Sequence, residues 1–279
     1  MLQPAVVSKR ILILVALLAL GILFSSEISD SDFWWHLKTG EYIASTHSLP
    51  SPDPFSFTTS TSAAEAVVRQ VNLTHEWLAQ LILYGAYGAL GFPGVILLRV
   101  SLLLIFCGIS AWVVYRRGMG IDRAIAAGVA AGLAVLPSVA DRPYLFTFVF
   151  IAVFIAVLDG ASAKLRWALP VIMLIWANAH GGFILGLAIL GVWAGAALLE
   201  RKPRRQLLLV SGLTFAAAAL NPNGFRVFQV LLAYPGCARA LGLMYASVGE
   251  PANARRWLSL YTQHHSGSDP EVERAFLAQ

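Results

Sequence analysis

The feature that most constrains this chain is a series of apolar segments, each close to the length of a membrane-spanning helix. Such a helix needs about 20 predominantly apolar residues. The segments that meet or approach this length are 11–26, 95–115, 121–140, 143–160, 167–179, 181–199 and 206–221. Because 58% of the residues are hydrophobic and only 13% are charged, against about 25% charged in soluble domains, the composition favours a multi-pass membrane protein.

Lysine and arginine cluster in the short connections between these segments, namely at Lys9-Arg10, 115–123, 164–166 and 201–205. Such clusters mark the cytoplasmic side of a membrane protein. All of them lie on that side only if the further apolar stretch 77–92 does not cross. We therefore expect an all-α bundle of about seven spans, with an interfacial or re-entrant helix over 76–94. Eight spans, with 77–92 crossing, are the alternative.

This topology places the N-terminus in the cytoplasm and the non-basic connections outside. The segment 11–26 is expected to be an uncleaved anchor, because LFSSEIS after it lacks a small-x-small cleavage site. The outer connections are the long loop 27–94 and the turns at 140–146, 178–182 and 221–224. The basic residues that raise the pI to about 9.4 flank the apolar segments, so we expect no nucleic-acid partner.

The outer loop opens with DSDFWWHLKTGEYI, residues 30 to 43. On a helix starting near Asp30, Asp32 and His36 share a face. An interfacial helix explains the tryptophans as an aromatic belt and one carboxylate as an N-terminal cap. It does not explain the second carboxylate or His36, so these three residues are functional candidates.

A second polar pair, His75 and Glu76, begins the apolar segment HEWLAQLILYGAYG. A glutamate in a first helical turn is also favoured by the helix dipole alone. Together with Asp30, Asp32 or His36, the pair could bind a divalent metal ion, since carboxylates and imidazoles suit several such ions. The spacing is not diagnostic of any metal, so the cofactor stays open.

Polar residues also stand at the ends of later segments. Asp141-Arg142 either neutralise each other or let Arg142 meet a phosphate with two hydrogen bonds. Asn178 and His180, in WANAHGG, are either turn residues or ligand contacts. Arg99 lies within an apolar run, where an arginine either extends to the interface or pairs with an acid.

Taken together, these motifs resemble one family of membrane proteins. The motifs are DSDFWWHLKTGEYI, LPSPDPFSFT, HEWLAQLILY, DRPYLFT, WANAHGGFILG and NPNG. They resemble the bacterial multi-pass proteins related to the GT-C-type glycosyltransferases, which include protein mannosyltransferases and aminoarabinose transferases that use polyprenyl-phosphate donors. The resemblance covers residues 8 to 230, so we assign 1–230 to a GT-C-like transmembrane domain.

The resemblance implies a seven-helix module in the bacterial inner membrane, a lipid-linked sugar donor and a catalytic aspartate in the acidic first outer loop. Asp30 or Asp32 corresponds to that aspartate, and Asp141 to a possible second acidic position. His36, His75, Glu76, Arg99, Arg142, Asn178 and His180 are the expected substrate contacts. Related enzymes continue with several more helices, which this chain lacks after residue 230.

The composition changes after residue 234. Leu241-Gly242, Tyr245, Gly249, Ala254 and Leu258 fall at the intervals of a tetratricopeptide repeat, a helical hairpin of 34 residues. We therefore expect a tetratricopeptide-like hairpin over 235–279, outside the cytoplasm. Because one repeat cannot bury its apolar face alone, it docks on the membrane domain, binds a protein partner or is the remnant of a longer array.

The expected function is transfer of a sugar from a polyisoprenyl phosphate to an extracytoplasmic acceptor, with Asp30 or Asp32 as the base. The alternative is a noncatalytic assembly protein or an inactive shortened homologue, which the length of the chain and its repeat-like tail would suit. A transporter would place charges and broken helices near the middle of the membrane. Here, apart from Arg99, the polar residues stand at one edge.

Overall fold

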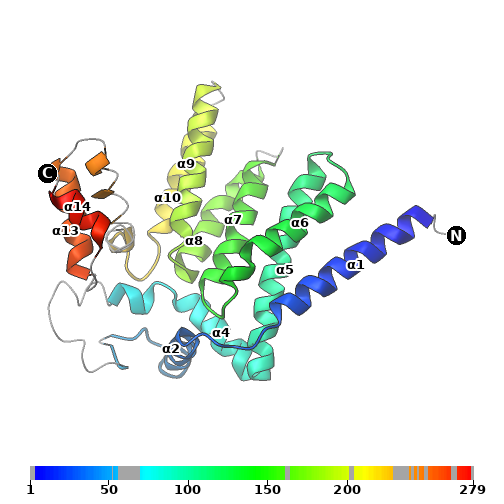
Figure 1. Ribbon diagram of the computed structural model, residues 1–279, viewed down its shortest axis with the longest axis horizontal. Coiled ribbons are helices and arrows are strands. Elements are labelled where there is room, and N and C mark those ends of the chain that lie inside the picture. The colour runs from blue at the N-terminus through cyan, green and yellow to red at the C-terminus, as the bar shows by residue number, and fades with distance from the viewer. Residues whose placement is uncertain are drawn as a thin grey trace. The chain divides into compact units, whose positions relative to one another are not determined.

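Figure 1 shows the computed structural model, which describes residues 4–51, 53–55, 70–160, 164–200, 204–228, 239, 242–243, 245–247, 251–264 and 269–277. Every regular element among these residues is a helix, as the sequence predicts. The chain divides into two compact units, Met1–Pro222 and Asn223–Gln279. The division falls between residues 222 and 223, before the change in composition after residue 234.

Unit 1 contains the apolar helices. They are α1 (Pro4–Phe24), α2 (Asp32–Thr46), α4 (Trp77–Leu90), α5 (Phe92–Arg116), α6 (Ile121–Val135) with the 3-10 turn η1 (Leu136–Ser138), α7 (Tyr144–Leu158), η2 (Leu165–Ala168) leading into α8 (Leu169–Ala179), α9 (Phe183–Leu199) and α10 (Arg204–Ala218). Helix α5 packs against α1, α4, α6 and α7, while α8 packs against α4, α7, α9 and α10. In Figure 1, α2 and α4 lie at the lower ends of α7 and α8.

Two helical stretches of the described chain are long and apolar enough to cross a membrane, Phe92–Arg116 and Ile121–Ser138. The apolar helices α4, α7, α9, 165–179 and 205–218 are shorter than 18 residues. Large apolar side chains on several helices face outward, and Leu18 and Val192 are 67% and 76% exposed. These features favour membrane association. The seven-span bundle remains a prediction, because helix length alone does not establish it.

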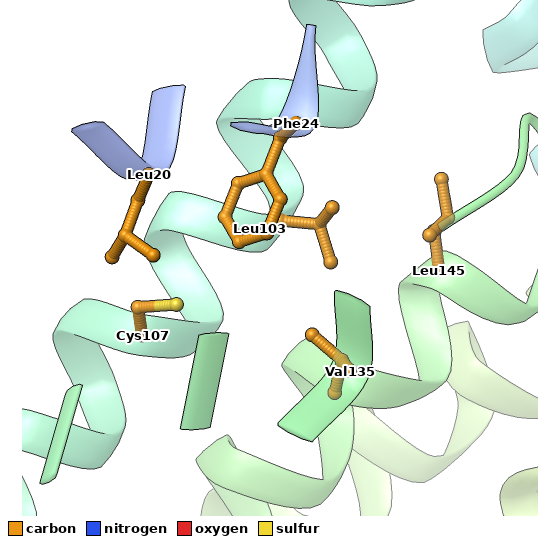
Figure 2. Close-up of a cluster of buried hydrophobic side chains, with 6 residues drawn as sticks. All are labelled: Leu20, Phe24, Leu103, Cys107, Val135 and Leu145. Carbon is orange, nitrogen blue, oxygen red and sulfur yellow. The ribbon is translucent and has the colours of Figure 1, made fainter. Parts of the chain in front are cut away.

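Side chains of α1, α5, α6 and α7 form one apolar core (Figure 2). It consists of Leu20, Phe24, Leu103, Cys107, Val135 and Leu145. Phe24 and Leu103 are fully buried. Gly132 allows the close approach of α6 to this core, because a Cβ there would lie 2.8 Å from the side chain of Leu20.

Three basic connections of unit 1 meet at the end of the bundle opposite to α2. Lys9 on α1 lies 3.7 Å from Asp122 at the start of α6. Arg116 and Arg117, at the end of α5, contact Asp159 after α7 at 3.0 and 2.6 Å. These are connections that the charge pattern assigns to the cytoplasmic side. The cluster 201–205 lies largely outside the described residues.

A second apolar cluster fixes α2 against α4 and α5. It contains the buried side chains of Phe33, Leu37, Leu83 and Val95. Helices α2 and α4 cross closely at Gly40, where a Cβ would collide with the backbone carbonyl of Gln80. This close crossing brings the polar side chains of α2 to the first turn of α4.

Unit 2 has its own small core. In α13 (Pro251–His264) and α14 (Pro270–Leu277), Leu258, Tyr261 and Val272 pack together. A Cβ at Gly242 would contact Leu258, so the glycine suits close packing there. Of the residues at repeat intervals, Leu241 and Gly249 lie outside the described residues. The tetratricopeptide assignment therefore stays a prediction.

Candidate functional site

Polar side chains from four separate connections gather at the end of unit 1 that carries α2. They come from the segment before α2 and the first turns of α2, the residues just before α4, the connection between η1 and α7, and the end of α8 with the turn after it, together with one residue of α5. The residues are Asp30, Asp32, His36, His75, Glu76, Arg99, Asp141, Arg142, Asn178 and His180. Most of them belong to two groups, one centred on Arg142 and one on Glu76. The pair Arg99–Asp141 and the side chain of Asn178 support these groups from buried positions.

Arg142 lies in the connection between η1 and α7, and its side chain contacts residues at the start of α2. Its Nε and NH2 donate to the two carboxylate oxygens of Asp30, the NH2 bond being 2.8 Å long, and its NH1 lies 2.9 Å from Asp32. The hydrogen bonds from Arg142 lower the pKa of Asp30 below its usual value. Asp30 also accepts the backbone N–H of Asp32 at 2.9 Å. It is therefore both a helix-terminal acceptor and a partner of Arg142, whereas a cap alone would need no such partner.

The two aspartates differ in access to solvent. The side chain of Asp30 is 12% exposed and that of Asp32 is 54% exposed, with Arg142 between them at 37%. Asp32 and Arg142 can therefore meet a ligand, while Asp30 holds Arg142 in place. Residues 30 and 32 therefore converge with residues 141 and 142 in the structure.

Arg99 pairs with an acid, which is one of the two alternatives that the sequence left open. Its NH1 donates to Asp141 at 2.6 Å, and the two side chains are only 2% and 1% exposed. Its Nε and NH2 donate to the backbone carbonyls of Phe24 and Ser26. Burial raises the pKa of Asp141, against the effect of Arg99. Because its donors are occupied and buried, the position of Arg99 suits fixing the chain after α1 better than contacting phosphate.

The second group surrounds the carboxylate of Glu76 with three imidazoles. Oε1 of Glu76 lies 3.2 Å from Nε2 of His75 and 3.4 Å from Nε2 of His180. Oε2 lies 3.7 Å from Nδ1 of His36. The side chain of Glu76 is only 11% exposed, so it is an anion in a largely dry environment. Such an anion requires donors around it.

His75 supplies one of these donors. Its Nδ1 lies 3.0 Å from the carbonyl of Val71 and its Nε2 faces Glu76. A ring that donates from both nitrogens is protonated. Although burial opposes the charge, the bond to Glu76 raises the pKa of His75. Burial likewise opposes ionisation of Glu76, but His75 and the other imidazoles lower the pKa of Glu76 to about 2. The two residues form a buried ion pair.

His180 has a different protonation state, which its neighbours determine. The backbone N–H of Gly182 donates to Nδ1 at 2.9 Å, so this nitrogen carries a lone pair. Thr147 lies 2.8 Å from the same nitrogen and itself accepts the indole N–H of Trp176 at 3.0 Å. The proton of His180 is therefore on Nε2, which faces Glu76. Burial lowers the pKa of His180 to about 4, so the ring is neutral at pH 7.

Asn178 supports this arrangement from one side. Its amide oxygen accepts the indole N–H of Trp77 at 2.7 Å, and its amide nitrogen donates to the carbonyls of Leu174 and Leu220 at 2.8 and 2.9 Å. The side chain thus links α4, α8 and the end of α10. Because these bonds use both ends of the amide, the geometry favours a turn and packing residue over a substrate contact.

His36 links the two groups. It lies on α2 one turn after Asp32, and its Nδ1 is 3.3 Å from the side-chain nitrogen of Gln80. Burial lowers the pKa of His36, while the charges of Glu76 and Asp32 raise it and that of Arg142 lowers it. The imidazole is therefore neutral at pH 7 and within electrostatic reach of both groups.

Sequence reasoning missed Thr147, Trp77 and Gln80. Thr147 lies within an apolar segment and carries no motif of its own. Gln80 had a visible signal, because it is a polar side chain in the apolar segment that follows Glu76, and it is fully buried. Its side-chain oxygen has no hydrogen-bond partner within the described part of the chain.

A metal ion is not supported as a cofactor. Among the described residues, no group of three or more histidine, cysteine, aspartate or glutamate side chains could hold one. In addition, Nδ1 of His180 already accepts the N–H of Gly182. Of the imidazoles around Glu76, His75 is better described as a hydrogen-bond partner of the carboxylate, while His180 and His36 face it at 3.4 and 3.7 Å.

Comparison with known proteins found no relative of this chain. No family model, no curated protein and no solved structure matches this chain. The resemblance to GT-C-type transferases therefore rests on the motifs alone.

Proposed function

We propose that this protein is a membrane glycosyltransferase that moves a sugar from a polyisoprenyl phosphate to an acceptor outside the cytoplasm. The observation that carries the proposal is the contact of Arg142 with both Asp30 and Asp32. It brings an accessible guanidinium and an accessible carboxylate together, beside the group around Glu76. The motif resemblance, which no comparison extends, supports the same reaction class.

The reaction requires two functions that these side chains suit. The leaving group is a phosphate, whose charge a guanidinium can stabilise with two hydrogen bonds. Arg142 is 37% exposed and can turn donors toward such a group. The acceptor hydroxyl or amine must be oriented and lose a proton. Asp32 is the more accessible carboxylate for holding that group.

The proposal includes a topology. We propose about seven spans in the bacterial inner membrane, with the N-terminus and the basic connections in the cytoplasm. The α2 end and the C-terminal tail then lie outside, with α2 and α4 along the outer interface. The apolar α5 and α6 support this arrangement, as do the contacts that join Lys9 to Asp122 and Arg117 to Asp159.

Transfer assays on single variants test the proposal. Membranes containing the full chain would receive a labelled polyprenyl-phosphate sugar, and the envelope glycans of a deletion strain would identify the acceptor. We expect Asp30→Asn, Asp32→Asn and Arg142→Lys each to lower transfer by about tenfold or more. Glu41→Gln is the matched control on the same helix, since Glu41 is 45% exposed and paired only with Lys38 among the described residues. Full activity in both aspartate variants would rule out a catalytic role for this loop.

A noncatalytic assembly role is the second candidate. The self-contained core of unit 2, formed around Leu258 and Tyr261, favours it because such a module can hold a partner. Deletion of residues 223–279 separates the two functions. An enzyme of unit 1 retains transfer without the tail, whereas an assembly protein loses its complex and shows no transfer with or without the tail.

A further inference from the structure

A cavity of about 280 Å³ lies between α1, α5 and α6. Its lining comes from residues 13–20 of α1, 107–115 of α5 and 121–129 of α6, and it is almost entirely apolar. At one end, which we call the core end, Leu20 and Cys107 belong to the apolar core of unit 1. At the other, the basic end, the cavity reaches Tyr115 and Ile121, beside the connection between α5 and α6.

The packing of the three helices explains the cavity. A Cβ at Gly128 would lie 3.0 Å from the carbonyl oxygen of Cys107, so α6 packs tightly on α5. At Gly132 a Cβ would lie 2.8 Å from the side chain of Leu20, so α1 is close to α6 at the core end. Toward its N-terminus α1 leans away from both helices (Figure 1). A Cβ at Gly108, in the lining, would have nothing within 4 Å.

Basic side chains cluster at the basic end of the cavity. They are Lys9, Arg10, Arg116, Arg117 and Arg123. Asp159 takes up the charges of Arg116 and Arg117. Because Lys9 lies 3.7 Å from Asp122, the neighbouring residues Arg10 and Arg123 belong to this end as well. Both arginines are exposed, and neither forms an ion pair with a residue of the described chain. Two cations are therefore available to a ligand beside an apolar cavity.

We propose that the cavity binds one acyl chain of an anionic glycerophospholipid, whose headgroup phosphate is held by Arg10 and Arg123. The lipid belongs to the leaflet that faces the basic connections, which is the cytoplasmic leaflet in the proposed topology. The inference uses this topology but not the transfer reaction. The lipid is distinct from the sugar donor, because the donor phosphate must reach Arg142 at the opposite end of unit 1.

The shape and the charge of the site favour this occupant. A cavity of 280 Å³ holds less than one turn of an α-helix, which is about 10 Å across, so a hydrocarbon chain suits it better than a helix of a partner protein. Lipid chains are as apolar as the helix surfaces that they meet, so the cavity alone selects no particular lipid. Basic residues on the cytoplasmic side do select, because they attract anionic headgroups. The selectivity of the site therefore comes from the two arginines.

Native mass spectrometry of the full chain in detergent tests the proposal. The probes are dioleoyl phosphatidylglycerol, which is anionic, and dioleoyl phosphatidylcholine, which has the same chains and no net charge. We expect the wild type to bind one phosphatidylglycerol about tenfold more tightly than phosphatidylcholine, since two basic side chains meet its headgroup. Phosphatidylglycerol should also raise the unfolding temperature more, because a ligand of the folded chain stabilises it. Equal affinities for the two lipids would overturn the proposal.

Two variants separate the chain site from the headgroup site. Gly108→Leu fills the cavity at a position with room for a side chain, so the tightly bound lipid should be lost. Gly191→Leu on α9 is its matched control, because a Cβ there also has nothing within 4 Å and the residue lies outside the cavity. The double variant Arg10→Gln, Arg123→Gln should bind both lipids equally, whereas Lys38→Gln on α2, at the opposite end, should behave as the wild type.

Three results would overturn the assignment. They are tight lipid binding by Gly108→Leu, a retained preference for phosphatidylglycerol in the double arginine variant, and displacement of phosphatidylglycerol by equimolar polyprenyl phosphate, which would make the cavity a donor site. The arginine variant changes only exposed side chains, so it tests the proposal even if Gly108→Leu does not fold. None of these measurements involves sugar transfer, so their failure leaves the proposed function standing.

Discussion

Arg99 and Asp141 form an ion pair in which Arg99 NH1 and Asp141 Oδ2 are 2.6 Å apart and neither side chain is more than 2% exposed. The pair adjoins the Arg142 group, because Asp141 and Arg142 are consecutive residues. Arg99 also donates to the carbonyl of Phe24, the last residue of α1, and to that of Ser26. One buried guanidinium thus holds together the end of α1, helix α5 and the connection that carries Arg142.

The first prediction concerns this pair. Asp141→Asn should leave a buried guanidinium without its counter-charge, a loss that typically costs about 3 kcal/mol or more. Thermal unfolding of the detergent-solubilised protein measures the change. Asp159→Asn is the control, because Asp159 is 23% exposed and exposed pairs contribute about 1 kcal/mol or less. Equal losses of stability in the two variants would contradict the expected difference between the buried ion pair of Asp141 and the more exposed one of Asp159.

The second prediction concerns the crossing of α2 and α4. Gly40→Ala places a methyl group against the carbonyl of Gln80, so the helices must separate and His36 must move away from Glu76. We expect a lower unfolding temperature. Gly88→Ala on α4 is the matched control, since a Cβ there has nothing within 4 Å. An unchanged unfolding temperature in Gly40→Ala would show that the crossing is looser than the structure indicates.

Much of this arrangement could be predicted from the sequence, because apolar length and charge placement report on helices directly. The charge pattern places the polar connections at residues 30, 76, 142 and 180 on the same side of the membrane, and the structure brings them together. Which partner each side chain takes could not be predicted. For example, Asp141 pairs with Arg99 because of the way α5 packs against the connection after η1. The proton positions on His75 and His180 depend on backbone groups of Val71 and Gly182, which no side-chain motif reveals.

The third prediction concerns sidedness. In a variant lacking Cys107 and Cys237, a single cysteine is introduced either at Glu41 on α2 or at Arg123 on α6, both outside the core. An impermeant thiol reagent should label position 41 in intact cells and position 123 only after permeabilisation, because the basic connections are expected in the cytoplasm. Labelling of position 123 in intact cells would reverse the proposed topology.

The last prediction is a dependence of stability on pH that His180 produces. Its pKa is lowered from 6.5 to about 4 in the folded protein, so between these values the unfolded chain binds the extra proton and the folded chain does not. The contribution of His180 to the free energy of unfolding is fully present above pH 6.5 and decreases as the pH falls toward 4. Between pH 7 and pH 5 the loss should be roughly 2 kcal/mol. The lowered pKa of Glu76, about 2 instead of 4.5, acts in a separate window below pH 4.5.

Unfolding temperatures at pH 7 and pH 5 measure this effect. His180→Gln should show a smaller decrease between the two pH values than the wild type, because glutamine does not titrate. His47→Gln is the matched control. Its side chain is exposed at the end of α2, so we expect this variant to show the same decrease as the wild type. If His180→Gln keeps the full decrease, the ring already takes up its proton in the folded protein at pH 5, and the hydrogen bond from Gly182 does not hold its Nδ1 as an acceptor.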